Sequence, residues 1–349
     1  MPRPIAGEGS IVSALSDVAR LAQVSKATAS RALSGNGYVS EQTRDRVVSA
    51  AAEIGYVVSS NASSLVTGQT RNVGVVIPHI NRWYFGEVLE GIESALIAAG
   101  YDLTLYRLSA DADERRRVFE YFLVRKRVDA VIAVGIELTT REVAMLHSLA
   151  KPVIGIGGPV EGVAALSIDD VSAAAFVTHH LISLGHTNIM HIGGSQQKEM
   201  DFRVHSQRLL GFTQAMRGAG LPHGHENVRA TDLSIDGGYS AGLAVLADPS
   251  TRPSAIAAGS DEVAIGVIVA ARQLGIQVPE QLSVVGIDGH PLAPMFGLTT
   301  LAQHPKGQGT QAVGLVMDEL LGSADPVRAW RAHPVNLEVR RSTTAPPAL

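Results

Sequence analysis

The sequence predicts a small all-α helix-turn-helix head, followed by an α/β core of two lobes that are each a doubly wound parallel sheet. Three observations predict this architecture. Two short helical patterns joined by a tight turn occupy residues 15–33, and a third follows at 39–56. Residues 57–70 are small and polar apart from Leu65 and a few valines, as in a linker with helical potential. From residue 72, short β-branched runs alternate with amphipathic stretches.

The head is expected over residues 14–58, after a loose tail at 1–13. Gln23-Val24 makes the turn between the first two helices, and Ser25 is a suitable N-cap for the second. Ser40 caps the third helix, which stops at Gly55. The side chains expected to face inward are Leu15, Val18, Ala19, Ala22, Ala29, Ala32, Leu33, Val47, Val48, Ala51 and Ile54.

The second helix is expected to turn a polar face outward. The residues on this face and at the start of the helix are Ser25, Lys26, Ala27, Thr28, Ser30 and Arg31. Donors at a helix N-terminus suit phosphate and one long bidentate donor suits guanine, so the pattern indicates a reader of the DNA major groove. The alternative is an ordinary amphipathic helical hairpin; the third helix favours the DNA-reading head.

The charge balance argues against a protein that coats nucleic acid through bulk charge. Lys and Arg total 29 against 33 Asp and Glu, a net charge of −4. Residues 1–70 hold six basic and five acidic side chains, a net charge of only +1. DNA binding must therefore be local, and a single head should bind weakly.

The lack of cysteine excludes disulfides, zinc thiolate sites and cysteine nucleophiles, and it fits a reducing cytoplasm. The N-terminal residues contain no apolar stretch typical of a signal peptide, and no later apolar run has the length of a membrane span. We therefore expect a cytoplasmic protein that makes no membrane contact.

The core is expected over residues 72–343. The first series has strands at 73–78, 101–106, 129–135 and 152–157 and helices at 86–99, 111–126 and 139–149. The second has helices at 171–184, 205–219, 237–247 and 261–274 and strands at 188–194, 254–259 and 282–288. A strand at 298–303, a helix at 306–321 and a strand near 335–341 are too little for a third lobe. We expect lobe one over 72–168 plus 303–325, and lobe two over 169–302 plus 326–343.

Several short stretches of the head and the linker match one known family. They are Asp17-Val18-Ala19, Val24-Ser25, Thr28-Ala29-Ser30-Arg31, Val39-Ser40, Thr43-Arg44, Gly55-Tyr56, and Ala62 with Leu65. In these stretches the sequence strongly resembles the lac repressor/galactose repressor (LacI/GalR) family of bacterial transcription regulators. The resemblance implies that residues 59–71 form a hinge helix on DNA, with Leu65 wedged into the minor groove beside Asn61 and Ala62. Tyr38 joins the expected DNA contacts, and an inert tether whose leucine packs on the core is the alternative.

The resemblance continues through the core. Matching stretches are 82–93, 167–174, 180–194, 208–212, 259–266, 278–288, 298–305 and 339–343. It implies a periplasmic-binding-protein-like core that closes on a small-molecule effector, a homodimer, and double-stranded operator DNA as partner. The implied effector is a sugar or nucleobase-like molecule, most simply a carbohydrate, and no cofactor is implied.

A cleft between two such lobes places ligands at the carboxyl ends of the strands. Tyr84 and Phe85 follow the first strand and match the aromatic effector position of the family; a core aromatic pair is the alternative. Arg208 and Asp261 offer a fork of donors and a pair of acceptors for vicinal hydroxyls or a polar ring. A structural ion pair or an N-cap is the alternative for these two. Leu233 is placed in the same pocket by position.

Catalysis finds little support, and we expect no enzyme. The sequence has no phosphate-binding glycine loop, and its Ser, Asp and His residues suggest no triad. His179, His180, His186 and His191 lack the spacing of a metal site. The remaining alternative is a sugar-binding or sugar-transforming protein with the same two-lobed core. Residues 1–70 argue against it, because such a protein would not need a helical head and a hinge.

Two positions of the head depart from the family pattern. Ala14 stands where a hydroxyl normally caps the first helix, although Ser13 could substitute. Gln23 replaces the usual turn glycine, which is a strained choice if that residue needs a positive φ.

Overall fold

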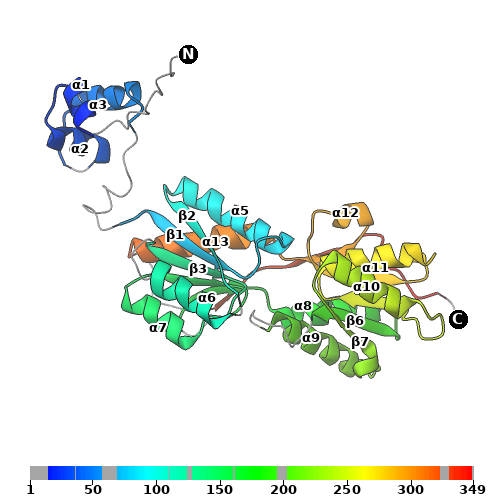
Figure 1. The fold of residues 1–349 in the computed structure, drawn as a ribbon. Helices are drawn as coiled ribbons and strands as arrows, with labels where there is room; N and C mark the ends of the chain where they lie inside the picture. The colour runs from blue at the N-terminus through cyan, green and yellow to red at the C-terminus, as the bar shows by residue number, and fades with distance from the viewer. Residues whose placement is uncertain are drawn as a thin grey trace, which may run out of the picture. The chain divides into compact units, whose positions relative to one another are not determined.

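The computed structural model describes residues 15–35, 37–56, 69–109, 111–123, 128–159, 162–194, 203–322 and 330–347. The chain divides into two compact units, Met1–Arg71 and Asn72–Leu349 (Figure 1). Most of the expected hinge at 59–71, including Asn61, Ala62 and Leu65, lies outside the described residues, as does Ala14.

The described residues of the first unit form the helices α1 Leu15–Leu21, α2 Lys26–Ser34 and α3 Glu41–Glu53. Its core consists mainly of valine and alanine, and these small side chains let the helices cross closely. Val48, which we expected to face the first two helices, is exposed instead. Val47, Ala50 and Ala51 are buried, so these residues form the inward face of α3 and Val48 lies outside it.

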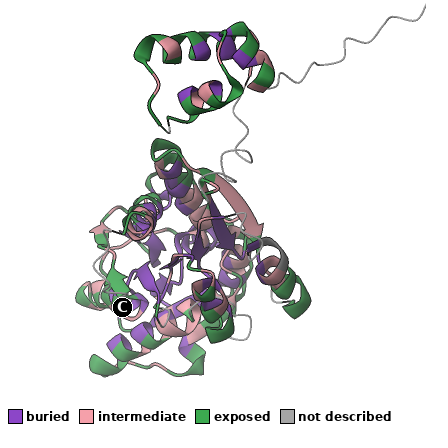
Figure 2. Ribbon diagram, turned by 90° about the vertical axis from the view of Figure 1, so that its left-hand side faces the viewer, coloured by how far each residue is buried: buried purple, intermediate pink, exposed green. Residues whose placement is uncertain are grey.

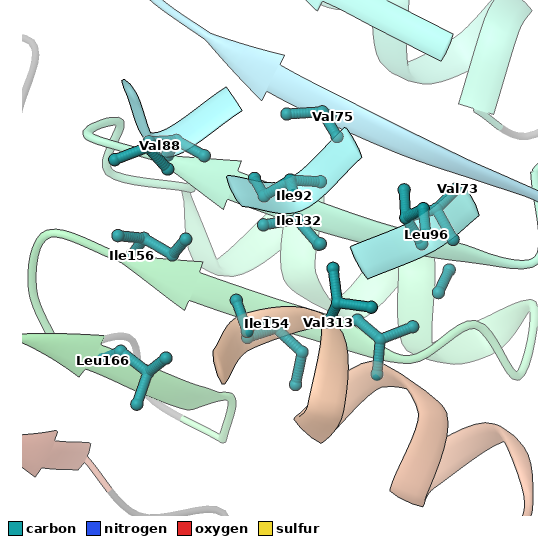
Figure 3. Close-up of a cluster of buried hydrophobic side chains, with 14 of the residues drawn as sticks. Val73, Val75, Val88, Ile92, Leu96, Ile132, Ile154, Ile156, Leu166 and Val313 are labelled. Carbon is teal, nitrogen blue, oxygen red and sulfur yellow. The ribbon is translucent and has the colours of Figure 1, made fainter. Parts of the chain in front are cut away.

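The first lobe of the core is a six-stranded parallel sheet with strand order β11-β5-β4-β3-β1-β2. Its strands are β1 Asn72–Ile77, β2 Asp102–Arg107, β3 Ala130–Val134, β4 Val153–Ile156, β5 Ala164–Ser167 and β11 Trp330–Ala332. One face carries α5 Trp83–Ala98 and α13 Pro305–Leu320, and the other carries α6 Ala112–Arg117, a π-helical turn Val118–Leu123 and α7 Thr140–Ser148. Figure 3 shows the α5 and α13 side chains over the buried strands.

The second lobe repeats this build with strand order β12-β10-β9-β8-β6-β7. Its strands are β6 Ile189–Gly194, β7 Val228–Thr231, β8 Ala255–Ala258, β9 Ser283–Asp288, β10 Thr299–Ala302 and β12 Asn336–Glu338, the last antiparallel. One face carries α8 Asp170–Ser183 and α9 Val204–Gly218; the other carries α10 Ile235–Leu246, α11 Asp261–Gln273 and the short α12 Ala293–Phe296. A 3-10 turn, His225–Asn227, precedes β7. Buried residues gather in the strands and on the helix faces turned toward them (Figure 2).

The predicted fold class, a helix-turn-helix head with a two-lobed α/β core, is confirmed. Three short strands were missed in the sequence: β5, β7 and β11. Because β11 pairs with β5, the chain stays in the first lobe through Ala332, so its last crossing comes after that residue and not after 325. The helix expected over 111–126 is also wrong in part, since a π-helical turn follows α6.

Glycines set the spacing of the helix pairs on these sheets. A Cβ added at Gly91 of α5 would lie 2.1 Å from the carbonyl oxygen of Lys306, and one at Gly309 of α13 would lie 2.2 Å from that of Val88. Gly211 makes the same kind of approach between α9 and α8. Such contacts bring the helix backbones together, and in the first lobe they set α13 against α5.

Within the described part of the chain, every helix is too short or too polar to cross a membrane.

Candidate DNA-reading helix and interlobe site

The second helix of the head has the cap that its sequence predicts. The Ser25 hydroxyl accepts a hydrogen bond of 3.0 Å from the Thr28 backbone N–H, and Gly35 ends the helix in a left-handed conformation. Lys26, Ala27, Ser30 and Arg31 are exposed, while Ala29 and Ala32 are buried. The helix therefore presents its polar face to solvent, with the N-terminal backbone donors available beside it.

The turn before this helix is strained in the way its sequence suggests. Gln23 has a φ of 54°, in the left-handed region that favours glycine. The Val24 N–H nevertheless reaches back to the Ala19 carbonyl at 2.9 Å and closes the turn. After the helix, Tyr38 is 93% exposed, which leaves its ring accessible.

In the second lobe, Arg208 of α9 lies in a buried cluster of charges and is 6% exposed. Its Nε donates to Asp170 Oδ1 at 2.8 Å, and its Nη1 donates to the Gly259 carbonyl at 2.5 Å and lies 3.5 Å from Asp288 Oδ1. Burial lowers the pKa of Arg208, but the Asp170 and Asp288 carboxylates outweigh it and leave that pKa above its ordinary value. The guanidinium is thus charged and held in one orientation.

Asp261 is fully buried at the start of α11, but Ser260, not Asp261, is the N-cap. Its Oδ2 accepts hydrogen bonds from the Gly289 N–H at 2.9 Å, the His290 N–H at 2.7 Å and the Thr300 hydroxyl at 2.9 Å. Its Oδ1 faces Gly286, where an added Cβ would lie 2.1 Å away. These contacts fasten the turn after β9 to α11.

The two aromatic residues of the first lobe are both half-buried, but they differ in surroundings. The Tyr84 hydroxyl donates to Gln308 Oε1 at 3.1 Å, and Tyr84 lies within electrostatic reach of Arg208 in the other lobe. The Phe85 ring instead packs against Gly135, whose added Cβ would lie 2.6 Å from it, and against Tyr84 in an edge-on contact. The geometry favours Tyr84 as the residue that faces the second lobe.

Arg82 and Trp83 of the first lobe contact the second lobe directly. Arg82 Nη1, at the N-cap of α5, donates to the Leu233 carbonyl, while Leu233 is also packed against the core of the second lobe. The Trp83 ring lies 4.5 Å from the His290 ring, centroid to centroid. Arg82 and Trp83 therefore contact the second lobe in consecutive positions, directly before Tyr84.

Sequence reasoning missed Asp288, Asp170, Gln303 and Gln308. Asp288 is the last residue of β9 and has a φ of 140°, so the rule that ligands gather at the carboxyl ends of strands could have found it. Asp170 was visible in the sequence as a carboxylate beginning a helix. The two glutamines carry no such signal, because only the crossing into α13 brings them to this place.

The clustered histidines serve the fold of the second lobe. Burial lowers the pKa of His191 to about 4, so its ring is neutral beneath Arg208 and bonds the Ala257 carbonyl at 2.9 Å. His186 bonds the hydroxyls of Ser254 and Ser283 at 2.9 and 3.0 Å. Among the described residues, no group of three or more His, Asp or Glu side chains is arranged to hold a metal ion.

Comparison with known proteins matches two parts of the chain to two family models. Residues 14–59 match the family model described as "Bacterial regulatory proteins, lacI family", and residues 178–343 match "Periplasmic binding protein-like domain". The repressor PurR of Vibrio vulnificus (strain CMCP6) is 30% identical over 330 residues, which are 92% of this chain and 96% of that protein. The chain belongs to the lacI family. It is therefore a sequence-specific DNA-binding transcriptional regulator.

Two further likenesses extend over most of this lacI-family chain. Catabolite control protein A of Priestia megaterium is 30% identical over 305 residues, 86% of this chain and 90% of that protein. The structure of the lac repressor dimer bound to operator and the anti-inducer ONPF covers 95% of this chain and 99% of its own, with a TM-score of 0.83 and 23% identity. The relatives are regulators, not enzymes, and the structural likeness extends the shared fold to both lobes.

Proposed function

We propose that this regulator holds its small-molecule effector between the two lobes, against Arg208 and Asp288 from one lobe and Tyr84 from the other. The observation that carries the proposal is the buried Arg208 guanidinium, which two carboxylates hold in place while Tyr84 of the facing lobe lies within electrostatic reach. Within the described residues, its Nη2 makes no hydrogen bond and is the donor left for a ligand.

The chemistry of this site suits a neutral molecule with several polar groups on a small frame. A guanidinium donor, a carboxylate and a phenol supply donors and acceptors from two sides, which fits the vicinal hydroxyls of a carbohydrate. A nucleobase, with donors and acceptors on a flat ring, is the second candidate, and the similarity to PurR repressors favours testing it. Phe85, Leu233 and Asp261 would support the site from behind.

On the DNA side, we infer that α2 enters the major groove of operator DNA. Ser25 and Thr28 would meet phosphate, and Lys26, Ala27, Ser30 and Arg31 would face base edges, with Arg31 forking onto guanine. Tyr38, Asn61, Ala62 and Leu65 would contact DNA beyond this helix, Leu65 as a minor-groove wedge. The likeness to the lac repressor dimer supports a homodimer on a two-fold symmetric site.

A panel of sugars and purine bases tests the effector site by thermal shift on the full chain. A true effector at 100 times its Kd adds about 2.7 kcal/mol of stability, and the same compound must change operator affinity in a footprint. Asp288→Asn should lose both responses, whereas Asp236→Asn, which removes an exposed carboxylate in the first turn of α10, should keep them. A compound that stabilises Asp288→Asn as well as wild type would place the effector elsewhere.

A further inference from the structure

A chain of hydrogen bonds runs from the first lobe into the charged cluster of the second. The Tyr84 hydroxyl donates to Gln308 Oε1 at 3.1 Å, and Gln308 Nε2 donates to Gln303 Oε1 at 3.2 Å and to the Gln303 carbonyl at 2.8 Å. Gln303 Nε2 then donates to Asp288 Oδ1 at 2.6 Å, which lies 3.5 Å from Arg208 Nη1. Gln303 lies on the crossing from β10 to α13, and Gln308 lies near the start of α13.

Two fixed acceptors set the direction of the bonds in this chain. The Asp288 carboxyl oxygen accepts from the Gln303 side chain, so Gln303 presents its amide NH₂ to Asp288. The backbone carbonyl of Gln303 can only accept, so Gln308 presents its own NH₂ to Gln303, and the Gln308 oxygen is left to accept from Tyr84. The Tyr84 proton is thereby committed to Gln308, and the remaining hydrogen-bonding capacity of its oxygen is as an acceptor.

Gln308 occupies a position where an apolar side chain would be the simpler choice. It is 0% exposed on the face of α13 that packs into the lobe, next to the glycine contacts that bring α13 against α5. Burial of an amide is costly unless its groups are bonded, and here both its oxygen and its nitrogen have partners. The glutamine is therefore held by the bonds it makes toward Tyr84 and Gln303.

We propose that Gln308 is a positioning residue for effector recognition, in a relay that passes the orientation fixed at Gln303 to Tyr84. The relay commits the Tyr84 proton to Gln308, so a ligand that bonds the Tyr84 oxygen must do so as a donor, and a ligand that bonds Arg208 must offer it an acceptor. This specificity rests on the proposed effector site. The relay itself exists in the unliganded chain and can be tested there.

The test follows the side-chain NH₂ resonances of Gln303 and Gln308 by NMR in the full-length chain without ligand. Tyr84→Phe removes the donor at one end, and Asp288→Asn changes the acceptor at the other. Each substitution should shift the NH₂ signals of both glutamines, including the one it does not touch. In a Gln308→Met chain, Tyr84→Phe should no longer shift the Gln303 signal.

Gln311→Met is the matched control, because Gln311 lies one turn along α13 and its oxygen contacts His333 at 3.1 Å instead of the relay. In this chain the effect of Tyr84→Phe on Gln303 should persist. If Tyr84→Phe shifts Gln303 equally with and without Gln308, the communication runs through Arg208 and the proposal is overturned. Should Gln308→Met fail to fold, the two end substitutions decide alone, since an unshifted far glutamine contradicts the relay. A missing ligand response, by contrast, would count only against the effector site.

Discussion

Asp261 illustrates how one buried carboxylate can organise the turn beside the proposed effector site. Its Oδ2 gathers three donors from the turn after β9 and from β10, while within the described residues its Oδ1 has no hydrogen-bond partner. Burial, reinforced by the neighbouring Asp288, raises the pKa of Asp261 to about 7 against the lowering effect of those donors. Ionising Asp261 therefore costs more free energy in the folded chain than in the unfolded chain.

This raised pKa predicts a pH-dependent stability difference. An aspartate of pKa about 3.9 in the unfolded chain binds its proton more tightly when folded, so its stabilising contribution is lost as pH rises from about 4 to about 7. Asp261→Asn stays neutral, so its melting temperature should gain on that of wild type across this window and level off above it. Asp236→Asn, at the exposed first turn of α10, controls for loss of a helix-terminal carboxylate. A difference independent of pH would contradict the buried, proton-binding form of Asp261.

At the scale of elements, the contact between α5 and α13 is the structural basis of the interlobe site. Gly91 and Gly309 let the two helices meet backbone to backbone, which places Gln308 beside Tyr84 at the N-terminal end of α5. The two helices also share one hydrophobic core, in which Ile92 and Val313 are buried (Figure 3). A change in the spacing of α5 and α13 should therefore alter both the stability of the chain and the position of Tyr84.

Two glycines of α13 should respond to alanine with opposite signs. At Gly309 the new Cβ would lie 2.2 Å from the Val88 carbonyl oxygen, so the helices must separate at a cost of about 1–3 kcal/mol. At Gly314 no heavy atom lies within 4 Å of the added Cβ, so Gly314→Ala should stabilise the helix by about 0.5–1 kcal/mol. Urea unfolding of both variants checks this, and equal effects would show that α13 tolerates a wider spacing.

At the scale of the whole molecule, the weak charge of the head favours the homodimer proposed above. Residues 1–70 carry a net charge of only +1, so phosphate contacts from one head give little affinity, and a dimer doubles them on a symmetric site. Because each head would read one half of that site, a change in one reading residue should appear twice in the consensus.

Selection of preferred DNA sequences by the full-length Arg31→Ala variant tests both the proposed homodimer and the proposed base-reading role of Arg31. Loss of a bidentate contact to guanine costs about 1–3 kcal/mol, so preference should flatten at two positions related by the two-fold symmetry of the site. Arg46→Ala removes an exposed arginine from α3 instead and should leave the consensus unchanged. An unchanged consensus for Arg31→Ala would remove Arg31 from the base-reading set, and flattening at a single position would contradict a symmetric dimer.

The sequence by itself determined what depends on local pattern. Apolar spacing and the Ser25 cap predicted α2 and its outward face, and alternating runs predicted both sheets, because helix and strand periods act over a few residues. The short strand β11 escaped because its three exposed residues show no pattern, and only its pairing with β5 defines it. The interlobe relay was decided by tertiary structure alone: Tyr84 lies 224 positions before Gln308 in the sequence, and their hydrogen bond exists only once the chain has crossed back to the first lobe.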